Sequence, residues 1–159
     1  MLQLRKKNTA LTTGEQKTVD RAMEVLDRAA KRQGSVFSSI SMVKKYFKTR
    51  LSGLSKEKFE VAFLDTGLRL IECETMFDGS ADYVHVDVTE ITRKALTLNA
   101  TRVILAHNHP SGNANASDGD KLLTKEIKGV LSQFDIVLCD HIIVADGKTP
   151  FSMSEANLL

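Results

Sequence analysis

The sequence feature that most constrains the fold is a change in the spacing of apolar residues near residue 55. Before it, apolar residues recur every three or four positions, which predicts amphipathic helices from Thr13 onward and over residues 39–50. After it, apolar residues alternate with their neighbours, which is typical of strands. We therefore divide the chain into a basic helical N-terminal segment, 1–55, and a domain at 56–159.

The second part of the chain alternates between predicted strands and helices. Strands are predicted at 59–64, 68–74, 84–88, 102–106 and 136–144. Helices are predicted over 91–98, with Thr89 as a candidate N-cap, and over 118–133, with Ser117 as the N-cap. This succession predicts an α/β fold in which helices cover a mixed sheet.

Composition and targeting signals exclude several classes of protein. With 42% hydrophobic residues and only 9 Gly and 2 Pro among 159, the chain is neither disordered nor collagen-like. No apolar run approaches the roughly 18 residues of a membrane span, and no apolar stretch of a secretory signal follows the basic start. We therefore expect a cytoplasmic protein in which Cys73 and Cys139 are reduced core residues.

The overall net charge of +2 is distributed unevenly. Residues 1–56 contain 13 Lys or Arg and four Asp or Glu, and residues 57–159 contain nine and 16, so the two parts carry +9 and −7. The basic segment could bind nucleic acid or an acidic protein, or it could pack on the acidic part with its charges facing water. Both interpretations remain open, although the lack of Trp argues against a base-stacking surface.

Two histidines and one aspartate have the spacing of a metal site. His107 and His109 stand at the end of a predicted strand, where side chains at i and i+2 point to the same face, and Pro110 keeps His109 extended. Asp120 follows at the start of a predicted helix, three residues after Ser117, where both residues could also form a simple capping box. Two nitrogens and one carboxylate leave a fourth position for water, as in a catalytic zinc site.

The stretch from His107 to Asp120 resembles the JAMM motif of MPN/JAB metalloproteins, H-x-H-P-x(6)-S-x-x-D, and its Asn108 and Gly112 resemble the bacterial RadC-like branch. The resemblance extends over about 57–159 and implies a curved mixed sheet sandwiched by helices, layered as in cytidine deaminases. Unlike most RadC-type proteins, the chain has Ala rather than Pro before the motif serine. No helix-hairpin-helix motif precedes the domain, so we expect the short form met on phage and other mobile elements.

The resemblance also implies a function, namely a zinc-dependent metallopeptidase or isopeptidase that hydrolyses an amide bond with a metal-activated water. His107, His109 and Asp120 would hold Zn²⁺. Ser117 would donate to the tetrahedral oxyanion, and a glutamate would act as general base. The expected partner is a peptide or isopeptide substrate. His141, in the last long predicted strand, is expected to be a structural histidine.

Two glutamates are candidates for the general base. Glu57 stands two residues ahead of an aromatic residue, as the family glutamate does, and would share a strand face with Phe59. Glu60 would point to the opposite face and, in a half-buried strand, to solvent. We therefore predict that Glu57 is catalytic and that Glu60 is not. We expect His85, in another alternating segment, to lie at the surface.

Two further classes of function remain open. A DNA-associated repair or mobile-element accessory protein would use the basic segment 1–55, although metal nucleases more often gather several carboxylates around two ions. A catalytically silent zinc-binding scaffold is the other class. Silent relatives typically lack one of the ligands, whereas this chain has both histidines and the aspartate.

Overall fold

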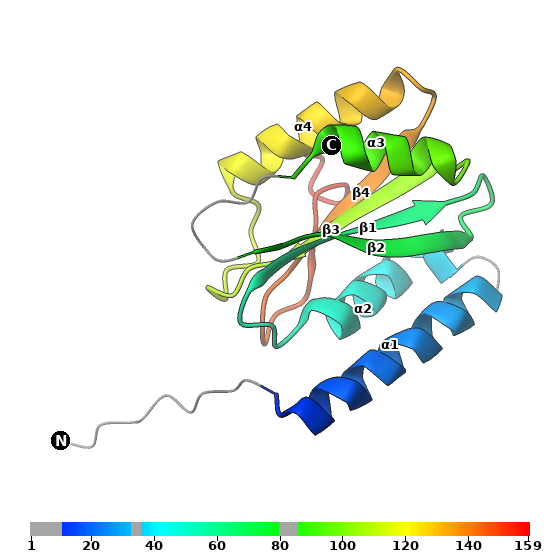
Figure 1. The fold of residues 1–159 in the computed structure, drawn as a ribbon. Coiled ribbons are helices and arrows are strands. Elements are labelled where there is room, and N and C mark those ends of the chain that lie inside the picture. The colour runs from blue at the N-terminus through cyan, green and yellow to red at the C-terminus, as the bar shows by residue number, and fades with distance from the viewer. Residues whose placement is uncertain (1–10, 33–35, 80–85) are drawn as a thin grey trace.

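The computed structural model describes residues 11–32, 36–79 and 86–159, and its centre is a five-stranded mixed sheet (Figure 1). The strands are β1 Glu57–Leu64, β2 Leu70–Gly79, β3 Arg102–Asn108, β4 Val137–Val144 and β5 Phe151–Ser152. They lie in the order β2-β1-β3-β4-β5. Strands β3 and β4 are parallel, and the other neighbouring pairs are antiparallel.

Helices cover both faces of this sheet. They are α1 Thr13–Arg32, α2 Ile40–Leu51, α3 Val88–Thr97 and α4 Asp118–Ser132, with a short 3-10 helix η1 at Val36–Ser38. Figure 1 shows α3 and α4 on one face and α1 and α2 on the other. The predicted α/β fold, a mixed sheet between helices after a helical N-terminal segment, is confirmed. None of the helices in the described ranges has the length and apolar character needed to cross a membrane.

Strand β1 contributes to two hydrophobic cores because both of its faces are covered. Phe59 and Phe63 pack on the side of α3 and α4, whereas Leu64 packs on the side of α2. Each fully buried side chain of this size contributes about 1.5–3 kcal/mol through removal of apolar surface from water. In the β1–β3 ladder Phe59 is paired with His107, so the start of β1 lies beside the end of β3.

The helices of the N-terminal segment share a core with the sheet. Phe37 of η1, together with Phe47 and Leu51 of α2, belongs to the same buried cluster as Ile142 of β4. Packing of this segment on the sheet is therefore part of the fold. The boundary after residue 55 remains a prediction about how the sequence is organised.

The described part of the segment predicted as a strand, residues 86–88, is not a strand. Val84 lies outside the described residues, and Val88 is the first residue of α3. The N-cap is Asp87 rather than Thr89, since the Asp87 carboxylate accepts from the backbone N–H of Thr89 at 2.8 Å. Val86 and Ile91 lie in one core cluster on either side of the cap, as in a hydrophobic staple. The staple accounts for the apolar character of Val86.

Candidate metal centre

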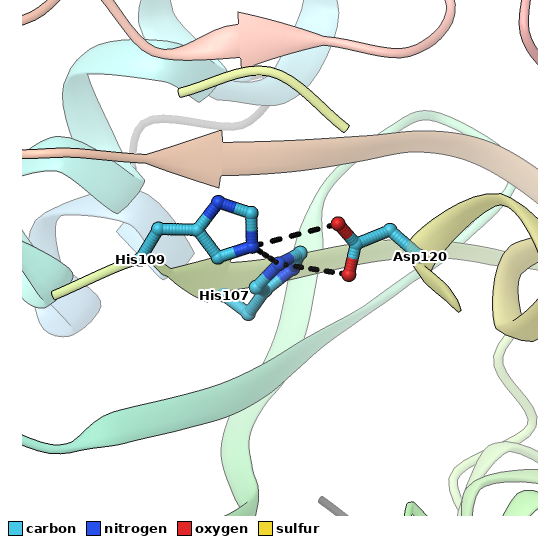
Figure 2. Close-up of side chains that lie close together, drawn as sticks. All are labelled: His107, His109 and Asp120. Carbon is cyan, nitrogen blue, oxygen red and sulfur yellow. Dashed lines mark hydrogen bonds and ion pairs between the residues drawn. The ribbon is translucent and has the colours of Figure 1, made fainter. Parts of the chain in front are cut away.

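Three candidate metal ligands converge where β3 ends beside the start of α4 (Figure 2). The Nε2 atoms of His107 and His109 are 2.9 Å apart. Asp120 Oδ1 lies 3.2 Å from His107 Nε2, and Asp120 Oδ2 lies 3.5 Å from His109 Nε2. Ligand atoms of the three residues all lie within 4.8 Å of one another, so the residues predicted from sequence form a group that could hold one metal ion.

Backbone hydrogen bonds hold the two histidines on one face of the sheet. His109 follows the last residue of β3, but its N–H donates to the Val144 carbonyl at 2.8 Å, so pairing with β4 continues past the strand end. Pro110 favours the same extended backbone. The chain then turns at Gly112, whose φ of 82° suits glycine better than other residues.

The capping box of α4 fixes the third candidate ligand. Ser117 Oγ accepts from the Asp120 N–H at 3.1 Å, and Asp120 Oδ2 accepts from the Ser117 N–H at 2.7 Å, as predicted from the sequence. The Ser117 hydroxyl also donates to Asp120 Oδ2 at 2.7 Å. The cap therefore engages one carboxylate oxygen, while the other, Oδ1, faces His107.

A hydrogen bond at the far side of the His109 ring identifies the nitrogen that presents a lone pair. His109 Nδ1 lies 2.7 Å from the Asn113 carbonyl oxygen. A carbonyl can only accept, so Nδ1 carries the hydrogen, and Nε2 of the neutral ring has a free lone pair. His107 Nδ1 is likewise engaged, 2.8 Å from His141 Nε2, and its Nε2 faces His109.

This donor set fits a cation. In the tautomers that bind metal, two nitrogen lone pairs face each other beside an anionic carboxylate, and only a positive charge between them relieves the repulsion. Zinc takes His nitrogens at about 2.0–2.1 Å and carboxylate oxygens at about 2.0–2.2 Å in a tetrahedral arrangement. His107, His109 and Asp120 would supply three positions and leave one for water, although imidazole and carboxylate ligands also suit other divalent metals.

Asp120 and His109 shift each other's pKa. Burial alone would raise the pKa of Asp120, but the adjacent rings of His107 and His109 hold that pKa well below its usual range. The same carboxylate raises the pKa of His109 above 6.5. Burial lowers the pKa of His141 well below 6.5, so its ring is neutral near pH 7. An ionised carboxylate therefore faces the histidines across the whole physiological range.

The convergent ligands open into a cavity of about 310 Å³. Its lining residues are Glu57, Phe59, His107, His109, Ser117, Gly119, Asp120 and Leu123. Glu57, the first residue of β1, is half-buried, and its carboxylate has no hydrogen bond or ion pair with the other residues that the structure describes. Both residues for which catalytic roles were predicted, Glu57 and Ser117, therefore share one cavity with the candidate ligands.

Asn108, between the two histidines, holds the backbone on both sides of Glu57. Its Oδ1 accepts from the Lys58 N–H at 2.8 Å, and its Nδ2 donates to the Lys56 carbonyl at 3.0 Å. The buried amide thus extends the pairing of β1 with β3 by one further step. No sequence pattern predicts this contact, because the partners are 50 and 52 positions apart.

Glu60 does not lie where the sequence suggested. It is on the opposite side of β1 from Glu57, as predicted, but only 3% of it is exposed. Arg50 of α2 donates to both Glu60 carboxylate oxygens, at 2.6 and 3.0 Å, which offsets the cost of burying a charge. The expected exposure to solvent was wrong because α2 and α1 cover this face of the sheet.

Two other histidines stood outside the predicted ligand set. His141 is fully buried in β4 and hydrogen-bonded to His107, which agrees with the structural role expected for it. His85 lies outside the described residues. The cysteines Cys73 and Cys139 are both free and partly buried.

Known proteins that resemble the chain share one family. The family model described as the RadC-like JAB domain matches residues 37–158. UPF0758 protein YkfG of Escherichia coli K12 is 38% identical over 149 residues, 94% of each chain. Two other proteins of that strain, UPF0758 proteins YfjY and YeeS, are 39% and 37% identical over 91% and 94% of this chain and 89% and 100% of their own lengths. A match of this extent, with the H-x-H-P and S-x-x-D residues gathered at one site, shows that the chain belongs to the RadC-like JAB domain family.

Proposed function

We propose that this protein is a zinc-dependent hydrolase that cleaves an amide bond in a peptide or an isopeptide. The observation that carries the proposal is the shared cavity, in which the Glu57 carboxylate lies with three convergent metal donors. His107, His109 and Asp120 would hold the ion. When bound, zinc supplies a Lewis acid and a water whose pKa is lowered towards neutrality. Membership of the JAB family supports a metallohydrolase as the class of enzyme.

The chain's own residues would supply the proton transfers. Glu57 would accept a proton from the attacking water and later return it to the leaving amine. Its lack of a partner among the described residues leaves both carboxylate oxygens available for this role. Asn108 would keep Glu57 at the edge of the cavity by holding the backbone before and after it.

Ser117 would stabilise the negative charge that develops on the carbonyl oxygen. Its hydroxyl donates to Asp120 Oδ2 at 2.7 Å, so it would have to rotate towards the substrate. The backbone N–H of Ser117 also donates to Oδ2, so this carboxylate oxygen would keep one hydrogen bond after the rotation. Phe59 and Leu123 provide apolar walls on which an uncharged substrate group could rest.

Metal dependence is the first test of this function. Purified protein would be stripped with a chelator, reloaded with zinc and assayed on a panel of fluorogenic peptides and lysine isopeptides. We expect about one zinc per chain, and hydrolysis that disappears with the chelator and returns with zinc. A zinc-loaded protein that cleaves no member of the panel would contradict the proposal.

A matched pair of aspartates tests the ligand assignment. Asp120→Asn should lose most of the bound zinc and all hydrolysis. Asp118→Asn, in the same helical turn but with a side chain that is 94% exposed, should keep both. Metal analysis after dialysis measures the difference. Full zinc occupancy in Asp120→Asn would show that the ion binds elsewhere.

A second candidate function is contact with nucleic acid or an acidic protein. It rests on Lys45, Lys48 and Lys56, which are exposed and form no ion pair within the described ranges. For duplex DNA, each phosphate neutralised contributes about −0.9 to the slope of log affinity against log salt. We expect Lys45→Glu with Lys48→Glu to abolish retention on duplex DNA at low salt, and unchanged retention would show that these lysines are merely solvated.

A further inference from the structure

We propose that His141 and Thr124 are positioning residues that align two candidate metal ligands, His107 and Asp120, through one directed chain of hydrogen bonds. His141 lies in β4 and Thr124 in α4, and at 0% and 1% exposure both are buried behind the cavity. Neither lines it. The inference rests on the metal site of the proposed function and extends it to residues that cannot touch a substrate.

The donors and acceptors in this series of hydrogen bonds can be assigned by starting from Thr124, its last residue. Thr124 Oγ1 lies 2.5 Å from the Asp120 backbone carbonyl and 2.6 Å from His141 Nδ1. A hydroxyl has one hydrogen and a carbonyl can only accept, so the Thr124 hydrogen goes to the carbonyl. The Met153 sulfur, 3.5 Å away, is a weaker acceptor. His141 Nδ1 must therefore donate to Thr124.

The direction then passes through His141 to His107. A neutral imidazole has one donor and one acceptor, so a donating Nδ1 leaves His141 Nε2 as the acceptor. His107 Nδ1, 2.8 Å away, must donate to it. His107 Nε2 then carries no hydrogen and presents a lone pair towards His109 and Asp120.

This order of donors selects the tautomer that can bind a metal. If His141 carried its hydrogen on Nε2, His107 would accept it on Nδ1, and the hydrogen of a neutral His107 would occupy the very nitrogen that faces the site. Either nitrogen of a neutral ring can hold the proton, so a fixed partner is needed to choose between them. Thr124 thus sets the tautomer of His107 indirectly, through its hydrogen bond to His141.

The same series of hydrogen bonds connects the three elements that carry the site. It runs from β3 through β4 to the first turns of α4, and it ends on the main chain of Asp120 itself. One side of the His141 ring is packed edge-on against Phe59, with ring centroids 5.5 Å apart. The partner of His107 is thus a neutral ring rather than the carboxylate or carbonyl that more often orients a ligating histidine.

Zinc affinity of Thr124 variants tests the inference. Thr124→Val removes the acceptor for His141 Nδ1 and keeps the side-chain shape, and we expect zinc binding to weaken about 10–100-fold, the range for loss of a partner behind a metal ligand. Thr124→Ser keeps the hydroxyl and should stay close to the wild type. Thr92→Val in α3, where a buried threonine hydroxyl likewise donates to the carbonyl four residues before it, should leave zinc binding unchanged. Chelator competition measures all four proteins.

Nitrogen-15 spectra of the histidine rings separate this inference from the proposed function. In wild-type protein, with or without zinc, we expect His141 to carry its hydrogen on Nδ1 alone. If the wild type binds no zinc but His141 has this tautomer, the proposed function fails and the directed chain stands. A hydrogen on His141 Nε2, or Thr124→Val protein that folds and binds zinc as tightly as the wild type, would overturn the inference.

Discussion

The two faces of β1 carry glutamates three residues apart with opposite surroundings. Glu57 lies in a cavity with two histidines and an aspartate, and its carboxylate is unpaired within the described part of the chain. Glu60 is buried on the other face, where Arg50 donates to both of its oxygens. Both oxygens of Glu60 are therefore occupied by one guanidinium, whereas no side chain of the described residues occupies those of Glu57. The partners, rather than the residue type, decide which glutamate can act as a base.

The cluster around Glu60 shows how the buried face satisfies its charges. Arg50 also donates to Asp27 of α1 at 2.9 Å, and the Tyr46 hydroxyl donates to the same carboxylate at 2.5 Å. The Arg50 guanidinium lies 5.5 Å from the centroid of the Tyr46 ring. Burial raises the pKa of Tyr46, so its hydroxyl remains a donor. This cluster joins α1 and α2 to the sheet, and we expect it to govern stability rather than chemistry.

Removing the proton acceptor should have the largest effect. Glu57→Gln keeps the size of the side chain and the three metal ligands but cannot take a proton. We expect hydrolysis to fall about 10²–10⁴-fold, or about 3–5 kcal/mol in activation free energy, with zinc content unchanged. Single-turnover rates and metal analysis measure the two quantities. Full activity in Glu57→Gln would move the assignment to another base.

The matching change on the other face should affect folding instead. Glu60→Gln removes one charge of a buried ion pair, and such a loss costs about 3–5 kcal/mol of unfolding free energy. Urea denaturation measures it, and zinc content of the folded fraction should equal that of the wild type. Loss of hydrolysis in a Glu60→Gln protein of normal stability would reverse the roles of the two glutamates.

A smaller effect should follow from Asn108→Asp. The new carboxylate can still accept from the Lys58 N–H but cannot donate to the Lys56 carbonyl. Leaving a buried acceptor without its donor costs about 1–3 kcal/mol, and an ionised carboxylate at this buried position adds to that cost. We expect hydrolysis to fall while the zinc content holds. Backbone amide exchange at Lys58 should stay protected. A variant equal to the wild type in stability and rate would show that Asn108 does not position Glu57.

The smallest effect should be that of His141→Gln on how the unfolding free energy depends on pH. The pKa of His141 lies below its unfolded value of 6.5, so below that pH the unfolded chain takes up a proton that the folded chain resists. Stability therefore falls as the pH drops through this range. We expect His141→Gln, which lacks this titration, to lose less unfolding free energy than the wild type between about pH 7.5 and 5.5. Parallel losses in metal-free samples would contradict this.

Much of the candidate site was predictable because its parts depend on local geometry. The i, i+2 spacing of His107 and His109 places them on one face of a strand, and the capping box places Asp120 in the first turn of a helix. Both patterns need only neighbouring residues to form. The same local rules misled at 86–88, where Val86 belongs to a hydrophobic staple and Val88 to the first turn of α3 rather than to a strand.

The sequence by itself determined the candidate ligands and the order of the longer strands and helices, since both depend on periodicity and short motifs. The short strand β5 and the start of α3 at Val88 were not predicted. The choice of Glu57 over Glu60 as the base stays a prediction, which rests on the family resemblance and on strand periodicity. Only the tertiary structure decided the partners. Arg50 for Glu60, Asn108 for the start of β1, and Thr124 with His141 for the ligands come from segments 10 to 52 positions apart. Such hydrogen bonds form where the packing of distant elements brings a donor and an acceptor together. The periodicity of the sequence reports only local structure, so it does not predict these contacts.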